Sequence, residues 1–319
     1  MKKAIIIFGF IVLSYPSYAQ ITTTKVAEKV DVNSTQPYDS LQNFLGEDVY
    51  KYVGQELYLK GKPKSLRKYG YEGFLLDYTK STLSNEKNVY KCCDSYNSKY
   101  DELAGKYFIV LKVIKHPKAK ENEYLYGDKY YLKLKEKESG DIVYYEYNAK
   151  FKNSFPFIVV GFYKKLKQLA IGQKFVFGNT EKRFGNDELD IKTGKPIVFE
   201  LGETWKCVDV TIEEKYYTLS LILKDNDGQT LAINYEMAIG PNKFYDVFTE
   251  KEANKYKQKF GQTNWNKILQ GKVVIGFTKE MVLLSWGKPE EINRSSYGEQ
   301  WVYPGQYLYF ENDKLKAFN

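Results

Sequence analysis

The chain has 319 residues and a formal net charge of +8, with 48 lysines and arginines against 40 aspartates and glutamates. Arginine contributes only Arg67, Arg183 and Arg294, and the lysines are interleaved with acidic residues along the whole chain. Nucleic-acid-binding proteins concentrate arginine and lysine on one face, so the dispersed pattern argues against a nucleic-acid partner. The length suffices for two or three domains.

The N-terminus has the charged, apolar and small-residue order of a secretory signal peptide over residues 1–19. Lys2 and Lys3 precede an apolar run at 4–13, and small residues lead to Ala19. The run is too short to anchor the chain across a bilayer, and no cysteine follows the cleavage box. We therefore expect an exported, periplasmic or extracellular protein without a lipid anchor or integral membrane segment. It would start at Gln20 with a net charge of +6.

Residues 20–40 are polar and without periodicity, which indicates a linker. Beyond the linker, three segments recur in the same order. The paired segments are 52–61 with 170–179, 105–114 with 202–212, and 130–149 with 216–238. This order predicts two β-rich repeats, over 41–163 and 164–262. In the alignment Phe108 corresponds to Trp205, and Gly54 corresponds to Gly172.

Each copy of the third segment has alternating apolar residues on both sides of a turn, which predicts an antiparallel hairpin. Gly140 and Gly228 provide the backbone freedom that these turns require. A helix is expected to follow the second hairpin. Thr249 and Glu252 form the pattern of a capping box, and Gly261 marks its end. A further helical turn is expected over 265–269.

Three cysteines, Cys92, Cys93 and Cys207, make an odd number for an oxidising compartment. A bridge between adjacent cysteines is expected to be strained, and a bridge from Cys207 to either of the others remains possible. The repeat alignment places Cys207 at the position of Val110. This alignment favours Cys207 as a small buried core residue.

The C-terminal residues predict a short helix followed by a β-meander. Thr278 is a favourable N-cap, Gly287 permits a left-handed exit, and Pro289 prevents continuation of the helix. Val282 and Trp286 lie on one side of this helix and are expected to pack on the sheet. The expected strands span 291–294, 299–303, 306–310 and 314–318. The fold class predicted for the whole chain is therefore β-rich α+β.

Within residues 263–319, the segments "GKVVIGFTKEMVLLSWGKPEEIN" and "EQWVYPGQYLYFENDKLKAF" resemble the SmpA/OmlA (BamE-like) family, whose module has a BLIP-like fold. The similar features are a G-x-T-K-x-x-V helix start, a W-G-x-P helix end, a W-x-Y strand and an L-Y-F-x-N-x-x-L hairpin. Phe277 stands where the family usually has Met, and Asp313 where it usually has Gly. The resemblance implies a small binding module of the bacterial envelope. Because the lipid-anchor cysteine is missing here, membership of the family's outer-membrane assembly machinery is not carried over.

The sequence contains no recognisable catalytic or metal-binding motif. His116 is the only histidine and lies in a polar connection before a proline, which disfavours histidine-based catalysis or zinc binding. Asp225 and Asp227 fit a hairpin turn better than a calcium loop. No catalytic residue, metal or cofactor is predicted. A hydrolase that uses an unrecognised carboxylate pair remains the weakest alternative.

Tyrosine is abundant, with 30 residues, and many alternate within expected strands. Tyr307 and Tyr309 are expected to point away from the C-terminal helix, with Lys316 beside them, whereas Leu315 and Ala317 point toward it. The leading prediction is a non-enzymatic exported envelope or secreted protein that contacts an unidentified envelope protein through this face. The face could instead be covered by an upstream repeat. The alternative function is glycan or peptide binding on tyrosine-bearing sheets.

Overall fold

The computed structural model describes residues 37–38, 40–80, 86–185, 188–214, 217–240 and 243–319. The predicted signal peptide and most of the predicted linker lie outside these residues. The predicted linker extends too far along the chain, because Tyr38 is only 8% exposed. Its ring packs edge-on against Phe162 with the ring centroids 6.4 Å apart, so Tyr38 already belongs to the hydrophobic core. No helix in the described part of the chain is long and apolar enough to cross a membrane.

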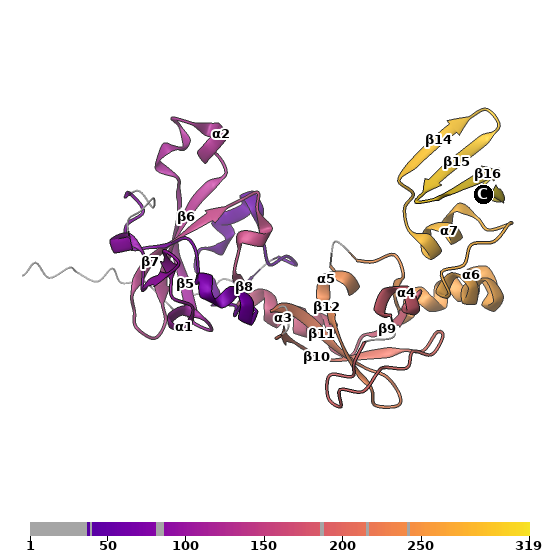
Figure 1. Cartoon of the computed structure of the whole chain (residues 1–319), viewed down its shortest axis with the longest axis horizontal. Coiled ribbons are helices and arrows are strands. Elements are labelled where there is room, and N and C mark those ends of the chain that lie inside the picture. The colour runs from indigo at the N-terminus through magenta and orange to yellow at the C-terminus, as the bar shows by residue number, and fades with distance from the viewer. Residues whose placement is uncertain (1–36, 39, 81–85, 186–187, 215–216, 241–242) are drawn as a thin grey trace, which may run out of the picture. The chain divides into compact units, whose positions relative to one another are not determined.

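The described strands form four antiparallel sheets, which confirms the predicted β-rich α+β fold (Figure 1). The smallest sheet pairs β3 (Cys92–Asp94) with β4 (Asn97–Ser98). The first large sheet has six strands. In order across the sheet they are β2 (Phe74–Leu75), β7 (Ile142–Asn148), β6 (Lys129–Glu136), β5 (Tyr107–Lys115), β1 (Glu56–Leu59) and β8 (Phe157–Val159).

The second large sheet has five strands. In order they are β12 (Thr230–Asn234), β11 (Thr218–Lys224), β10 (Trp205–Glu213), β9 (Lys174–Phe177) and β13 (Val247–Thr249). This order matches β7, β6, β5, β1 and β8 of the first sheet, as a duplicated topology requires. In the first sheet Leu57 lies opposite Phe108, and in the second Phe175 lies opposite Trp205. All four side chains are fully buried, so Phe108 and Trp205 occupy equivalent core positions.

The two glycines of the repeat make the same hydrogen bond in each sheet. Gly54 N–H donates to the Val110 carbonyl over 2.8 Å, and Gly172 N–H donates to the Cys207 carbonyl over the same distance. Both glycines have a positive φ, +78° and +89°, which residues with a Cβ adopt only at a cost. Strand β5 has a register shift directly after Val110, and β10 has one directly after Cys207.

The longer helices join the sheets. Helix α3 (Val160–Ala170) follows β8, and α6 (Glu250–Leu269) follows β13. The predicted capping box of Thr249 and Glu252 is present, and the helix breaks at Gly261, where φ is +78°. The predicted boundaries at 163/164 and 262/263 fall inside α3 and α6. The shorter helices are α1 (Tyr100–Leu103), α2 (Glu123–Tyr126), α4 (Thr180–Phe184), α5 (Tyr235–Ala238) and the 3₁₀ helices η1 (Gly46–Tyr52), η2 (Lys64–Tyr69), η3 (Glu86–Asn88), η4 (Pro117–Ala119) and η5 (Lys152–Ser154).

The C-terminal region has the predicted helix and meander. Helix α7 (Lys279–Trp286) begins at Thr278, whose hydroxyl accepts a hydrogen bond from Met281 N–H, and it ends at Gly287 with φ +81°. The meander runs in sequence order through β14 (Glu291–Ser295), β15 (Gly298–Tyr303), β16 (Gln306–Glu311) and β17 (Lys314–Phe318). Val282 is fully buried in the same apolar cluster as Leu308. The helix therefore covers one face of the sheet.

Candidate functional site

The predicted tyrosines lie on the sheet face opposite α7. Tyr307 is 43% exposed and Tyr309 38%, whereas Leu308 is fully buried and Phe310 is 3% exposed. This alternation follows from the two-residue period of a strand. The structure therefore places both predicted tyrosines together on one accessible face of β16.

The centre of this face is polar but uncharged. In β14 and β15, Asn293 lies opposite Gln300, which lies opposite Tyr309 in β16. Asn293 donates a hydrogen bond to Gln300 over 3.2 Å, and Gln300 donates to the Tyr309 hydroxyl over 3.1 Å. Tyr307 lies opposite Val302. The side-chain amides thus hold the Tyr309 ring in a defined position.

Strand β17 departs from the predicted alternation. Tyr309 lies opposite Ala317 while the next residue, Phe310, lies opposite Leu315, so Lys316 is an extra residue in the pairing. Leu315 is buried as predicted, but Ala317 is exposed and not under the helix, because the register shift turns it to the tyrosine face. Lys316 is exposed, and its ammonium lies 3.8 Å from the Glu311 carboxylate.

Side chains on the opposite face of the sheet, which α7 covers, fix the meander in position. Trp301 and Phe310 pack with ring centroids 4.7 Å apart. Tyr303 donates a hydrogen bond to the Gly287 carbonyl over 2.8 Å, and burial raises the pKa of its phenol. Trp286 is half-buried, and its ring packs edge-on against Tyr303. These contacts tie the end of α7 to the meander.

The single histidine has a structural role. The His116 ring stacks on Tyr126 at 4.2 Å between centroids, and its Nδ1 accepts a hydrogen bond from Lys118 N–H at the start of η4. Partial burial lowers the pKa of the imidazole. Among the described residues, the rings that stack on the imidazole are those of Tyr126 and Tyr131.

The pairing of the cysteines differs from the sequence-based expectation. A disulfide joins the adjacent Cys92 and Cys93, the pairing that the sequence disfavoured. The two cysteines lie where the register of β3 against β4 shifts. Glu86 lies close enough to complete a group of three potential metal ligands, but the two sulfurs are bonded to each other. Cys207 is a free, fully buried thiol, as the repeat alignment favoured.

A buried carboxylate that sequence reasoning did not single out also proves structural. Asp190 accepts hydrogen bonds from the N–H groups of Lys192, Thr193 and Thr230. These donors, with the Thr230 hydroxyl, lower the pKa of Asp190 to about 2. Because all of these donors stabilise the ionised form, Asp190 holds the loop between α4 and β10 and is poorly suited to be a general acid.

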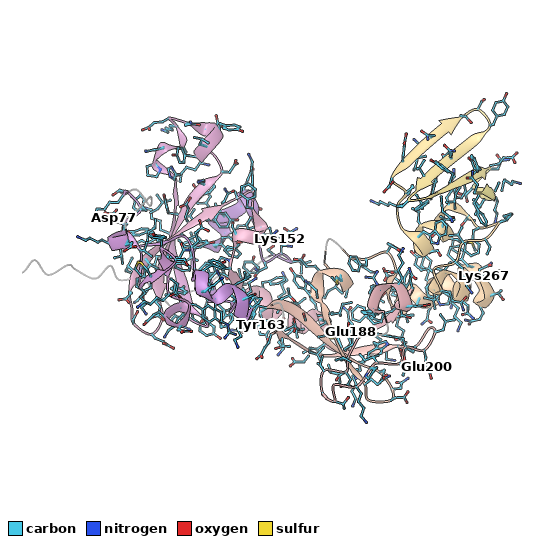
Figure 2. All side chains as sticks on the ribbon, viewed as in Figure 1. Asp77, Lys152, Tyr163, Glu188, Glu200 and Lys267 are labelled. Atoms are coloured by element: carbon cyan, nitrogen blue, oxygen red, sulfur yellow. A yellow bond between two sulfur atoms is a disulfide. The ribbon has the colours of Figure 1, made fainter. Side chains whose placement is uncertain are left out.

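Sequence reasoning also missed a tyrosine-lined cavity of ≈ 460 Å³, because its residues come from distant parts of the chain. Tyr58 comes from β1, Tyr107 from β5, Tyr163 from α3 (labelled in Figure 2) and Tyr217 from the turn before β11. The only signal in the sequence was the general abundance of tyrosine in strands. That signal does not show which rings come together.

Comparison of the chain with protein-family models, with curated proteins and with solved structures finds no match.

Proposed function

We propose that this chain is an exported, non-catalytic binding protein that contacts an envelope protein through the tyrosine face of its C-terminal sheet. The observation that carries the proposal is the exposure of Tyr307 and Tyr309 on a face whose opposite side packs against α7. Aromatic rings held by a rigid scaffold are frequent interface anchors, because they bury much area with little loss of side-chain entropy.

The chemistry of the face suits an uncharged protein surface. Its centre carries Asn293, Gln300 and Val302 beside the tyrosines. Among the nearby charges, Lys316 pairs with Glu311, and the exposed Glu291 lies opposite Val302 at the rim of the face. A partner would place apolar side chains on the rings and backbone or amide groups on Asn293 and Gln300. Salt should therefore have little effect on the affinity.

Three further features support the proposal. The N-terminal order of charged, apolar and small residues favours export. The resemblance of residues 263–319 to the SmpA/OmlA family favours a protein-contacting module in the envelope. The engagement of His116 and Asp190 in local structure favours binding over catalysis.

The test uses the mature chain, with its start at Gln20 checked by intact mass. A partner is first captured by cross-linking in native envelope extracts and then purified for titration. The double variant Tyr307→Ala, Tyr309→Ala should bind the purified partner at least about a hundredfold more weakly, since two interface anchors are removed. Its melting temperature should stay near that of the wild type, because both rings are exposed.

The matched control is Tyr297→Ala, which removes a 90% exposed tyrosine from the turn between β14 and β15 of the same module. This variant should bind like the wild type. Unchanged binding by the double variant would refute the proposed face. A large fall in its melting temperature would show instead that the rings belong to a core.

A further inference from the structure

The floor of the tyrosine-lined cavity is a pair of rings on neighbouring strands. Tyr58 in β1 lies directly opposite Tyr107 in β5, and their ring centroids are 5.1 Å apart with the planes tilted by 54°. The adjacent Leu57 and Phe108 are fully buried on the other side of the sheet. Tyr107 is 42% exposed, so the pair presents accessible aromatic surface to the cavity.

The walls are fixed by hydrogen bonds. The Tyr163 hydroxyl donates to the Val210 carbonyl over 2.8 Å. The Tyr217 hydroxyl accepts from the Arg67 guanidinium over 3.0 Å, and its ring lies so close to Gly61 that a Cβ there would collide with it. Rings held in this way lose little freedom when a ligand binds, which favours affinity.

The two floor tyrosines keep their hydroxyls available. Among the described residues, neither Tyr58 nor Tyr107 makes a hydrogen bond through its hydroxyl group, unlike Tyr163 and Tyr217. Burial raises the pKa of the Tyr58 phenol, so it stays protonated near neutral pH and can donate. The floor therefore combines an apolar ring surface with hydrogen-bonding groups at its edge.

The charges near the rings disfavour a cationic ligand. The Lys137 ammonium lies 5.8 Å from the Tyr107 ring centroid, and the Lys167 ammonium lies 5.3 Å from that of Tyr163. These two ammonium groups lie near the rings and would repel a cationic ligand. Each is paired with a carboxylate, Lys137 with Glu56 at 2.7 Å and Lys167 with Asp209 at 2.8 Å.

The remaining lining is neutral overall. Lys164 and Glu214 contribute one charge of each sign, and Ile158, Val160 and Ile212 add apolar surface. The volume lies in the range of small-molecule sites, which are mostly apolar with a few placed polar groups. A ligand that fits this lining has no net charge, an apolar face and hydrogen-bonding groups around its rim.

A sugar ring has those properties, because C–H groups form its faces and hydroxyls its rim. We propose that the cavity binds a neutral oligosaccharide, with one pyranose ring lying against Tyr58 and Tyr107. An extended peptide fits less well, because it would need an unpaired strand edge. Strands β1, β5 and β10 are paired on both sides. Strand β8, which contributes Ile158, is an edge strand, but its backbone is bonded by the Asn43 side chain, which donates to the Phe157 carbonyl and accepts from Val159 N–H.

The proposal is tested by calorimetric titration of the mature chain with cellohexaose, chitohexaose, maltohexaose, xylohexaose and mannohexaose. At least one should bind. Tyr107→Ala should weaken that binding about tenfold or more, because the stacking surface is lost. Tyr107→Phe and Tyr58→Phe should each weaken it about threefold by removing one hydroxyl. The control Tyr124→Ala removes a 94% exposed tyrosine of α2 that does not line the cavity, and it should bind like the wild type.

Failure of all five hexasaccharides to bind would overturn the proposal, as would unchanged binding by Tyr107→Ala with a native melting temperature. Saturable binding of the neutral peptide Ala-Tyr-Leu-Tyr-Ala, in place of any sugar, would also overturn it in favour of a peptide site. The result is independent of the proposed function. Tyr107→Ala should still bind the envelope protein, and the Tyr307→Ala, Tyr309→Ala variant should still bind the sugar.

Discussion

The two large sheets share a hydrogen-bonding framework but differ in what covers the face opposite their shared core. In the second sheet Val176, at the position equivalent to Tyr58, is 4% exposed and belongs to one apolar cluster with Phe248 and Trp265. In the first sheet Tyr58 is half-buried and lines a cavity. A repeated backbone therefore does not imply a repeated surface.

The helices that follow the last strand of each sheet account for part of this difference. Helix α6 breaks at Gly261, and its second part brings Trp265 against Phe248, with ring centroids 5.0 Å apart. Helix α3 has no such break and contributes Tyr163 and Lys164 to the cavity lining. The covered face in the second sheet stabilises the C-terminal region, whereas the first sheet leaves space for a ligand.

The largest expected loss of stability tests whether Phe108 and Trp205 occupy equivalent core positions. Phe108→Ala and Trp205→Ala should each destabilise the chain by about 3–5 kcal/mol, because each removes a fully buried ring at the same position of its sheet. Urea unfolding followed by circular dichroism measures the loss. The control Phe151→Ala removes a 63% exposed ring and should cost less than about 1 kcal/mol. A small loss for only one of the two core variants would contradict their equivalence.

An intermediate loss of stability tests whether Gly54 and Gly172 have the same backbone conformation. Gly54→Ala and Gly172→Ala should each cost about 1–2 kcal/mol, since both positions have a left-handed φ and space for the added methyl group. The two losses should agree, as measured by the shift in urea midpoint. Gly178→Ala is the control, because its φ lies outside the left-handed region and its Cβ would meet its nearest neighbour at an ordinary 3.4 Å. A loss of stability at only one of the two glycines would contradict the equivalence of these positions.

The smallest expected change in stability concerns Cys207, whose counterpart in the first sheet is Val110. Cys207→Val should change the stability at pH 7 by no more than about 1 kcal/mol, because valine fits the equivalent position of the same fold. Burial raises the pKa of the Cys207 thiol to about 11, from 9.0 for an exposed thiol. Above pH 9 the unfolded chain therefore loses this proton while the folded chain keeps it.

The thiol's contribution to stability is therefore complete below pH 9 and is lost as the pH rises toward 11. The wild type should lose more stability over this interval than Cys207→Val, as measured by urea midpoints in the same buffers. The difference isolates the thiol, because both proteins have the same tyrosines. Parallel pH profiles would show that the folded environment does not protect the thiol.

Much of the fold was predictable because its signals are local. The N-cap residues Thr249 and Thr278 and the helix breaks at Gly261 and Gly287 act within one turn of backbone. The correspondence of Phe108 with Trp205 was also readable, because each lies a fixed number of residues after a glycine. The burial of Leu308 between the exposed Tyr307 and Tyr309 followed from strand alternation alone.

The sequence by itself thus determined the two hairpins, the capped helices, the C-terminal meander, the order of the duplicated segments and the exposed tyrosines of β16. Only the tertiary structure decided the position of Ala317, because one extra residue in a strand pairing reverses the faces beyond it. It alone also brought Tyr58, Tyr107 and Tyr217 together around one cavity. Contacts between residues far apart in sequence depend on how whole elements pack, and no local pattern of residue types specifies that packing.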